Sequence, residues 1–367
     1  MNYLKNKKVL AGIGIGILVI VGIIVAVVAF GKKEEPKKVV ETTTPEVTTV
    51  EETTIEPEDP HKGKVQSYLT GEYIDKKQAK KRPIAVMINN IQDAIPQSGI
   101  SSAKVIYEAP VEGGITRMMA IFDEYEDLKR IGSIRSCRLY YPKFANEWNA
   151  IYVHFGQSKY ALDFLRSGKV NTVSALTREA SFYRESGKVA PHNLYATGAK
   201  LKEGIKALGY ETKYDSDYDG HFAFAQEEEP VTLEDGKKAN SVQMGYLINH
   251  PWFEYNKEKG QYYRFQYGGK HIDDLTNKQL HFSNIIIQFV DATLYPDNKS
   301  LNMTLTGSGS GWYITAGRAE KITWKKNKDL GQTSYYDASG EKIILNQGKT
   351  YIGIVQNEYS DNVKISK

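Results

Sequence analysis

The fold is decided by residues 105–122, which read VIYEAPVEGGITRMMAIF. Apolar runs at 105–107 and 118–122 lie on either side of a glycine pair, Gly113 and Gly114. Short apolar runs are typical of buried strands, and glycine readily adopts the positive φ angles of tight bends. We therefore predict two antiparallel strands joined at the glycine pair.

The segments around this hairpin predict a mixed sheet. Residues 83–90, PIAVMINN, indicate a short buried strand ended by asparagines that favour turns. Residues 139–148 carry apolar residues at helical spacing, and an apolar strand is expected at 151–155. A second amphipathic helix is expected at 196–208 before Gly209. Together these elements predict an α/β domain over residues 68–220.

Beyond Gly220 the pattern changes to short strands separated by glycine and asparagine, with no long helical pattern. This predicts a mostly β domain over residues 221–367, so the fold class is α+β. The strands are expected at 262–267, 285–289, 301–305, 311–315, 319–324 and 351–355.

The N-terminal segment predicts a membrane anchor. After a short tail at residues 1–8, residues 9–30 carry no charge and are long enough to span a bilayer as a helix. Residues 31–67 follow as a stalk rich in Thr, Pro and Glu that is expected to be extended. A cleaved secretory signal is the alternative for the apolar run. Both interpretations bring the chain to the membrane. The composition of the stalk favours a globular part outside the cytoplasm, with a cytoplasmic linker as the alternative.

The composition of the 367-residue chain limits the classes of function. A net charge of +4 with both signs mixed does not suggest a nucleic-acid binder. The single cysteine, Cys137, excludes an intrachain disulfide framework and a cysteine-rich zinc site. No cysteine follows the apolar segment directly, so a lipid anchor is not expected.

Nine distinctive motifs lie at 82–90, 96–99, 107–117, 131–136, 190–195, 307–311, 322–326, 336–340 and 345–350. Together they resemble the YerB-like family, Gram-positive proteins described as lipoproteins with paired N- and C-terminal domains of unknown function. The resemblance covers most of the chain. It implies an envelope protein outside the cytoplasmic membrane and brings no established reaction. The chain differs from that pattern by an apolar helix in place of the lipidated cysteine, and by Cys137 where alanine is expected.

Five charged residues, Glu108, Glu112, Arg117, Arg135 and Arg138, lie within or beside apolar strand ends. Arginine forks match carboxylates and phosphates with two hydrogen bonds, so these residues predict a pocket for an anionic group. The alternative is a pair of internal ion pairs, Glu112 with Arg117 across the hairpin or Glu108 with Arg135.

Histidines and the cysteine are the other candidates for chemistry. His192 and Asn193 lie in a predicted loop, where an imidazole can act as a base or bind a ligand, and His154 lies in the middle of a predicted strand. A structural role is the alternative for both histidines. Cys137 with either histidine would form a nucleophilic dyad, with the neighbouring arginines lowering the pKa of its thiol. The alternative is a buried, inert cysteine.

No cofactor is expected. The glycine-rich residues 307–311 lack the lysine and helix of a phosphate-binding loop and predict a mobile turn. Residues 215–220 begin like a calcium loop, but the twelfth position is Gln226. Tyr246, Trp252, Tyr255, Tyr262, Tyr263 and Tyr267 are compatible with stacking on sugars or with ordinary packing.

The leading hypothesis is therefore a membrane-anchored envelope protein that binds an anionic or glycan wall component, or a membrane partner, without catalysis. One alternative is a wall-modifying hydrolase or transpeptidase with Glu112, His154 or His192 as acid or base. The other is an adaptor for envelope proteins.

Overall fold

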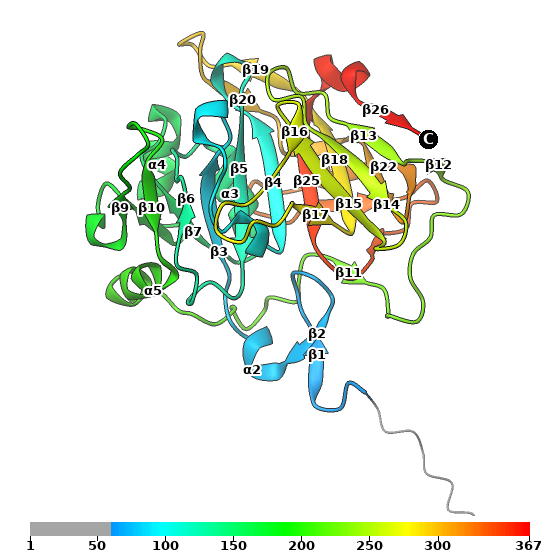
Figure 1. Ribbon diagram of the computed structural model, residues 1–367, viewed down its shortest axis with the longest axis horizontal. Coiled ribbons are helices and arrows are strands. Elements are labelled where there is room, and N and C mark those ends of the chain that lie inside the picture. Colours follow the sequence, from blue (N-terminus) through cyan, green and yellow to red (C-terminus); the bar gives the residue numbers. More distant parts are fainter. Residues whose placement is uncertain (1–59) are drawn as a thin grey trace, which may run out of the picture. The chain divides into compact units, whose positions relative to one another are not determined.

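A mixed sheet of eleven strands forms the centre of the fold in the computed structural model (Figure 1). Along the sheet the order is β12-β22-β21-β18-β25-β4-β5-β3-β7-β8, and β23 pairs with β22. The strands are β3 (Ile84–Asn89), β4 (Val105–Pro110), β5 (Thr116–Phe122), β7 (Ile151–His154), β8 (Thr172–Ser174), β12 (Lys237–Lys238), β18 (Asn284–Val290), β21 (Gly307–Thr315), β22 (Arg318–Lys326), β23 (Ser334–Tyr336) and β25 (Thr350–Gln356).

The structure describes residues 60–367. The predicted tail, the apolar segment at 9–30 and nearly all of the stalk lie outside these residues. Within the described part of the chain, no helix is both long and apolar enough to cross a membrane.

The predicted hairpin at residues 105–122 is confirmed. β4 and β5 are antiparallel, with Val105 opposite Ile121, and the turn Glu112–Gly114 joins them. Gly113 and Gly114 both have φ near +73°, a conformation that side chains with a Cβ rarely adopt. β3 lies antiparallel to β5 and parallel to β7, so the segment at 83–90 also forms the predicted strand.

The helices agree with the predicted α+β class. α3 (Tyr140–Glu147) and α5 (Gly198–Ala207) lie where helices were predicted. α5 begins two residues later than predicted because β10 (Leu194–Ala196) precedes it and the Thr197 side chain caps the helix by accepting from the Lys200 amide. Within residues 60–367, the remaining α-helices are α2 (Lys76–Ala79) and α4 (Lys159–Arg166).

The predicted boundary near residue 220 falls between strands. The hydrogen-bonded pair β4 and β25 carries the sheet across both predicted segments, with Val105 opposite Thr350. This pairing is parallel and joins residues far apart in the sequence.

Smaller sheets surround the central one. A six-stranded sheet contains β13 (Ser241–Gln243), β14 (Trp252–Asn256), β15 (Gln261–Gln266), β16 (Gly269–Lys270), β17 (His281–Phe282) and β26 (Lys364–Ser366). The others are β1 (Lys64–Gln66) with β2 (Tyr73–Asp75); β6 (Ile131–Gly132), β9 (Tyr183–Arg184) and β10; β11 (Ala223–Phe224) with β24 (Ile344–Leu345); and β19 (Ala292–Leu294) with β20 (Leu301–Met303).

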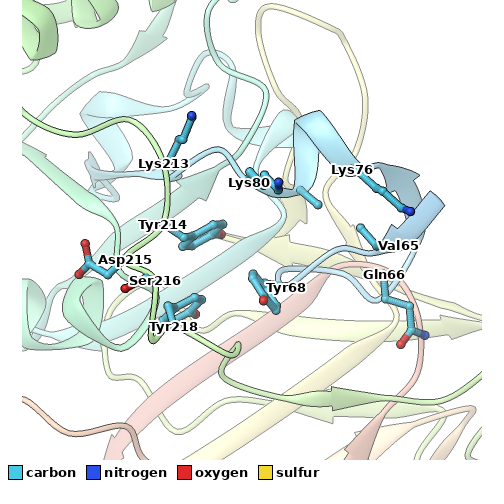
Figure 2. A pocket seen from close by; sticks show the side chains of 11 residues that line it. Val65, Gln66, Tyr68, Lys76, Lys80, Lys213, Tyr214, Asp215, Ser216 and Tyr218 are labelled. Carbon is cyan, nitrogen blue, oxygen red and sulfur yellow. The ribbon is translucent and has the colours of Figure 1, made fainter. Parts of the chain in front are cut away.

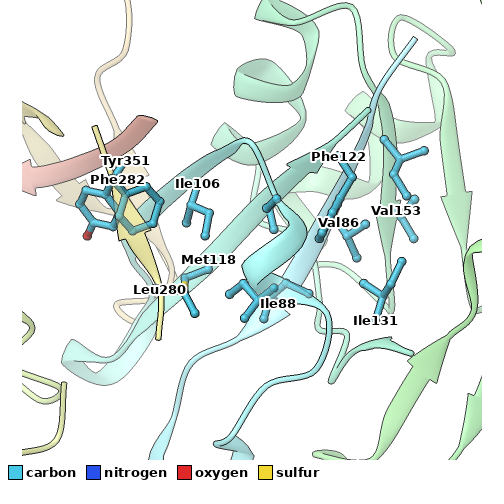
Figure 3. Packing of buried hydrophobic residues seen from close by; sticks show 14 of the residues in the cluster. Val86, Ile88, Ile106, Met118, Phe122, Ile131, Val153, Leu280, Phe282 and Tyr351 are labelled. Atoms are coloured by element: carbon cyan, nitrogen blue, oxygen red, sulfur yellow. The ribbon is translucent and has the colours of Figure 1, made fainter. Parts of the chain in front are cut away.

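Apolar side chains pack on both faces of the central sheet. Alternation along β5 sends Met118 and Phe122 into one cluster and Met119 into the other. Figure 3 shows part of the first cluster, in which Phe282 from the smaller sheet lies near Tyr351 of β25. Each large side chain buried in this way contributes roughly 1.5–3 kcal/mol to folding.

The glycine-rich residues 307–311 were predicted as a mobile turn, and this prediction is wrong. They form the first half of β21 and pair with β22, where Gly309 lies opposite Trp324. A Cβ on Gly309 would lie 2.6 Å from the indole nitrogen of Trp324. That nitrogen donates to the Phe289 carbonyl at 2.8 Å, so the glycines make room for a fixed tryptophan.

Candidate functional site

The candidate residues gather where β3, β4 and β7 end and β5 begins. Asn89 lies opposite Arg117 in the β3–β5 register, so both belong to the sheet face that carries Met87 and Met119. This is the face that α3 covers, through Tyr141, whose hydroxyl donates to the Arg117 carbonyl at 2.6 Å. Because successive side chains point to opposite faces of a sheet, Asn90, which follows β3, lies on the other face and contacts Glu108.

Arg117 is buried without an acidic hydrogen-bond partner. Its side chain is 3% exposed, and Nη1 donates to the Ser136 carbonyl at 2.8 Å and to the Ser136 hydroxyl at 3.3 Å. Burial, followed by the charge of Arg138, lowers the pKa of Arg117 to about 10. The guanidinium therefore stays charged at neutral pH although its surroundings disfavour the charge.

Arg138 holds the single carboxylate of the cluster. Its Nε donates to both oxygens of Glu112, at 2.6 and 2.8 Å, and Nη2 donates to Oε2 at 2.5 Å. Although burial acts to raise it, the hydrogen bonds and charge of Arg138 hold the pKa of Glu112 below its ordinary value. Arg138 also donates to the Ser136 hydroxyl at 3.0 Å, so one serine contacts both arginines.

The side chain of Arg135 uses only part of its hydrogen-bonding capacity. Its Nη1 reaches the Pro191 carbonyl at 3.5 Å, and its buried Nε has no hydrogen-bond partner among residues 60–367. Burial, together with the charge of Arg138, lowers its pKa. His192 follows Pro191, and its Nδ1 accepts a 2.9 Å hydrogen bond from the amide nitrogen of the Asn89 side chain. Burial and the charge of Arg135 lower the pKa of His192.

We call Arg117, Arg135, Arg138 and Glu112 the arginine cluster. Three guanidiniums face one carboxylate, so the cluster carries two more positive charges than negative ones. Arg135, Arg138 and Glu112 are each partly exposed. A partly open site with excess guanidinium charge can bind a phosphate or carboxylate.

His192 lies beside Arg135 of this cluster, whereas the predicted candidates His154 and Asn193 lie away from it. His154 is 1% exposed, and its ring nitrogens lie 2.8 Å from the Gly156 carbonyl and 3.4 Å from the Thr172 hydroxyl. Burial lowers the pKa of His154 to about 4, so the ring is neutral at pH 7. Asn193 accepts from Arg184 at 2.8 Å instead of facing the arginines of the cluster.

The predicted ion pairs are wrong in their partners. Glu112 pairs with Arg138 instead of Arg117, and Glu108 pairs with Arg264 instead of Arg135. The reason is the sheet geometry, because Glu108 lies opposite Met118 and so belongs to the other face of the sheet. The fully buried carboxylate of Glu108 accepts hydrogen bonds from Asn90, Thr116, Asn249, Arg264 and Tyr351. We call these six residues the Glu108 network.

For Cys137 the structure supports the buried, inert interpretation over the nucleophilic dyad. The thiol is fully buried and donates to the Arg138 carbonyl at 3.2 Å. Burial raises the pKa of Cys137 to about 12, and this effect outweighs the charges of Arg138 and Arg117. The protonated thiol is a poor nucleophile at neutral pH.

Sequence reasoning missed Asn89 and Ser136 as members of the site. Asn89 was interpreted as a turn residue, and only its 1% exposure and its contact with His192 reveal its role. The adjacent residues Asn89 and Asn90 offered a signal, because consecutive strand residues point to opposite faces and one asparagine therefore lies on each face of the sheet. Ser136 contributes both a carbonyl and a hydroxyl to the arginines, which no spacing rule predicts.

The aromatic stretch of the second segment is largely used in packing. The Tyr246 hydroxyl donates to the Glu108 carbonyl at 2.8 Å, and Trp252 stacks on Phe265 with ring centroids 4.9 Å apart. Tyr262 is fully buried. Among residues 60–367, no group of three or more His, Cys, Asp or Glu side chains is arranged to hold a metal ion.

Comparisons with known proteins agree with one another. Residues 69–211 match the model described as "Protein of unknown function (DUF3048) N-terminal domain", and residues 242–352 match its C-terminal domain. The chain is 30% identical to a Bacillus subtilis protein named "Putative lipoprotein YerB" over 314 residues, 83% of this chain and 89% of that protein. The crystal structure of YerB from Bacillus subtilis matches with a TM-score of 0.73 at 28% identity, covering 83% of this chain and 100% of that chain.

Proposed function

This chain belongs to the DUF3048 family of YerB-like proteins, and from that premise we propose that it is a cell-envelope protein whose arginine cluster binds an anionic group. The name of its Bacillus subtilis relative supports the envelope location, since a lipoprotein is held at a membrane surface. In this proposal residues 9–30 are the single-pass anchor and residues 60–367 lie outside the cytoplasm.

The observation that carries the proposal is the imbalance of charge in the arginine cluster. Arg117 and Arg135 have no carboxylate hydrogen-bonded to them within residues 60–367, and the Arg135 Nε is buried without an acceptor. A buried charge without a counter-charge is costly, and a bound anion removes that cost. The ligand is therefore a phosphate or carboxylate, such as those of wall polymers and stem peptides.

Geometry favours a ligand that approaches from the Arg135 side. The guanidinium of Arg138 already donates to Glu112 through Nε and Nη2, and Arg117 is buried. Arg135 therefore has the guanidinium that is most available to a ligand. Asn89 and His192 lie beside it and supply neutral hydrogen-bonding groups. The anionic group of the ligand would contact Arg135 first, and the charge of Arg117 would then complete the neutralisation of the anion.

The test is retention of the full-length chain on purified peptidoglycan with and without its anionic polymers. We expect the Arg117→Ala, Arg135→Ala double variant to bind at least roughly a hundredfold more weakly, since each charge-assisted hydrogen bond contributes about 1.5–3 kcal/mol and about 1.4 kcal/mol is a factor of ten. Arg166→Gln, an exposed arginine on α4, is the matched control and should bind as the unmodified protein does.

Unchanged retention of the double variant, with a melting temperature equal to that of the control, would contradict the proposal. The single variant Arg135→Gln guards against a folding defect, because Arg135 is partly exposed and Arg117 is buried. Release of soluble wall fragments by the protein would instead support the alternative of a wall-modifying enzyme.

A further inference from the structure

A cavity lies near the opposite end of β3 from the arginine cluster. The arginine cluster is at the end of β3, whereas this cavity lies beside the segment that leads into β3, where the Arg82 amide donates to the Thr212 carbonyl. A six-residue strand spans about 20 Å, so the two sites are separate. The cavity has a volume of about 560 Å³, within the range of small-ligand pockets.

Three tyrosines form the apolar wall of this cavity, as Figure 2 shows. The rings of Tyr214 and Tyr218 are parallel with centroids 4.8 Å apart, and Tyr68 meets both edge-on at 5.2 and 5.3 Å. Gly220 permits this arrangement, because a Cβ there would lie 2.9 Å from the Tyr68 ring. Backbone bonds fix the wall, including one from the Tyr214 amide to the Lys80 carbonyl at 3.0 Å.

Three lysines complete the lining with positive charge. Lys76, Lys80 and Lys213 are exposed, and none forms an ion pair or side-chain hydrogen bond with any of residues 60–367. Asp215 is the acidic residue of the lining, and its carboxylate already accepts from the Asn149 side chain and faces the charge of Arg82. The lysine charges are therefore available to a ligand.

The tyrosine hydroxyls are available as well. Within the described residues neither Tyr68 nor Tyr214 donates or accepts a hydrogen bond through its hydroxyl, and Tyr218 makes only a long one of 3.4 Å to the Glu147 carbonyl. Ring faces that meet free hydroxyl and ammonium groups suit a ligand that is both ring-shaped and polar.

We infer that this tyrosine-lysine pocket binds a sugar ring that carries an anionic group. The apolar faces of a sugar pack on tyrosine, its hydroxyls pair with phenol oxygens, and a phosphate attached to it attracts the lysines. The concave shape favours an inserted sugar over a flat membrane surface, against which side chains project outward instead of lining a cavity.

Isothermal titration of the full-length chain in mild detergent tests this inference, with N-acetylglucosamine phosphate as the probe. We expect saturable binding that weakens roughly tenfold in the Lys80→Gln, Lys213→Gln double variant. Lys202→Gln with Lys206→Gln, two exposed lysines on α5, is the matched control and should leave binding unchanged. The titrations are made in the Arg135→Gln background, which weakens the anion site proposed above, so that the remaining binding reports on the tyrosine-lysine pocket.

Two further ligands separate the contributions of the ring and the charge. Uncharged N-acetylglucosamine should bind more weakly than its phosphate, and Tyr214→Leu should reduce the affinity for the sugar phosphate to that for inorganic phosphate. Equal binding of glycerol phosphate and the sugar phosphate would overturn the inference, since it would show a site for a lipid headgroup or free phosphate. Absence of saturable binding, or binding that the lysine variant does not change, would overturn it too.

Discussion

Glu108 and Glu112 lie four residues apart at the same end of the central strands, but their surroundings differ in burial and in the number of partners. Glu108 is sealed between the sheets, accepts five hydrogen bonds and pairs with Arg264. Glu112 is partly exposed and faces an excess of arginines on the other face. A buried charge whose hydrogen bonds and counter-charge are all supplied by the protein has a structural role. A cluster with unmatched charge can instead bind a ligand of opposite charge.

The largest expected effect is on the closed side of this comparison. Glu108→Gln should lower the free energy of unfolding by about 3–5 kcal/mol, because it leaves the Arg264 charge buried without a partner. The new amide would also place donor hydrogens against neighbours that are themselves donors. Urea unfolding at neutral pH measures the change, and Glu124→Gln, an exposed glutamate, is the control. A loss below about 1 kcal/mol would show that the network is not a structural anchor.

Arg117→Met should have a much smaller effect on stability than its buried position suggests. Arg117 has no acidic hydrogen-bond partner and burial already disfavours its charge, so an apolar side chain of similar length should change the unfolding free energy by about 1 kcal/mol or less. Arg264→Met, measured in the same way, should cost several times more. Equal costs for the two variants would remove the distinction between the closed and the open charges.

The ion pair of Glu112 and Arg138 should give a small, pH-dependent effect. The pKa of Glu112 is lowered in the folded state, so its contribution is complete above the unfolded pKa of about 4.3 and is lost as pH falls through the folded value. The difference in stability between the unmodified protein and Glu112→Gln, below about 1 kcal/mol at pH 7, should therefore shrink below about pH 4. A difference that grows in acid would have the wrong sign.

The smallest expected signal is the reactivity of Cys137. Although arginines surround it, burial raises the pKa of the thiol to about 12. A thiol reagent at pH 8 should label the folded protein slowly and the urea-unfolded protein fully. Rapid labelling of the folded protein would indicate that the open side of the sheet extends to the thiol.

Sequence patterns predicted the strands and most helices because those signals are local. Alternation and the glycine pair sufficed for β4 and β5. The partner of Glu108 could not be predicted from the sequence, since Arg264 lies in another sheet and 156 positions further along the chain. The prediction for residues 307–311 was wrong for a related reason, because their conformation depends on Trp324 on the neighbouring strand.

The candidate site was predictable in composition but not in arrangement. The sequence indicated three arginines and Glu112 near strand ends, and the structure brings these together. Which carboxylate meets which arginine depends on the sheet face, and the inert state of Cys137 depends on burial. Neither follows from spacing in one sequence.

The affinity of the full-length chain for a purified anionic wall polymer, compared between Glu112→Gln and Arg135→Gln, tests the central claim most directly. If the open cluster binds an anion, removing its carboxylate should tighten binding several-fold and removing a guanidinium should weaken it roughly tenfold, with both effects reduced by salt. Equal affinities for both variants and the unmodified protein, or changes of the same sign, would contradict the account.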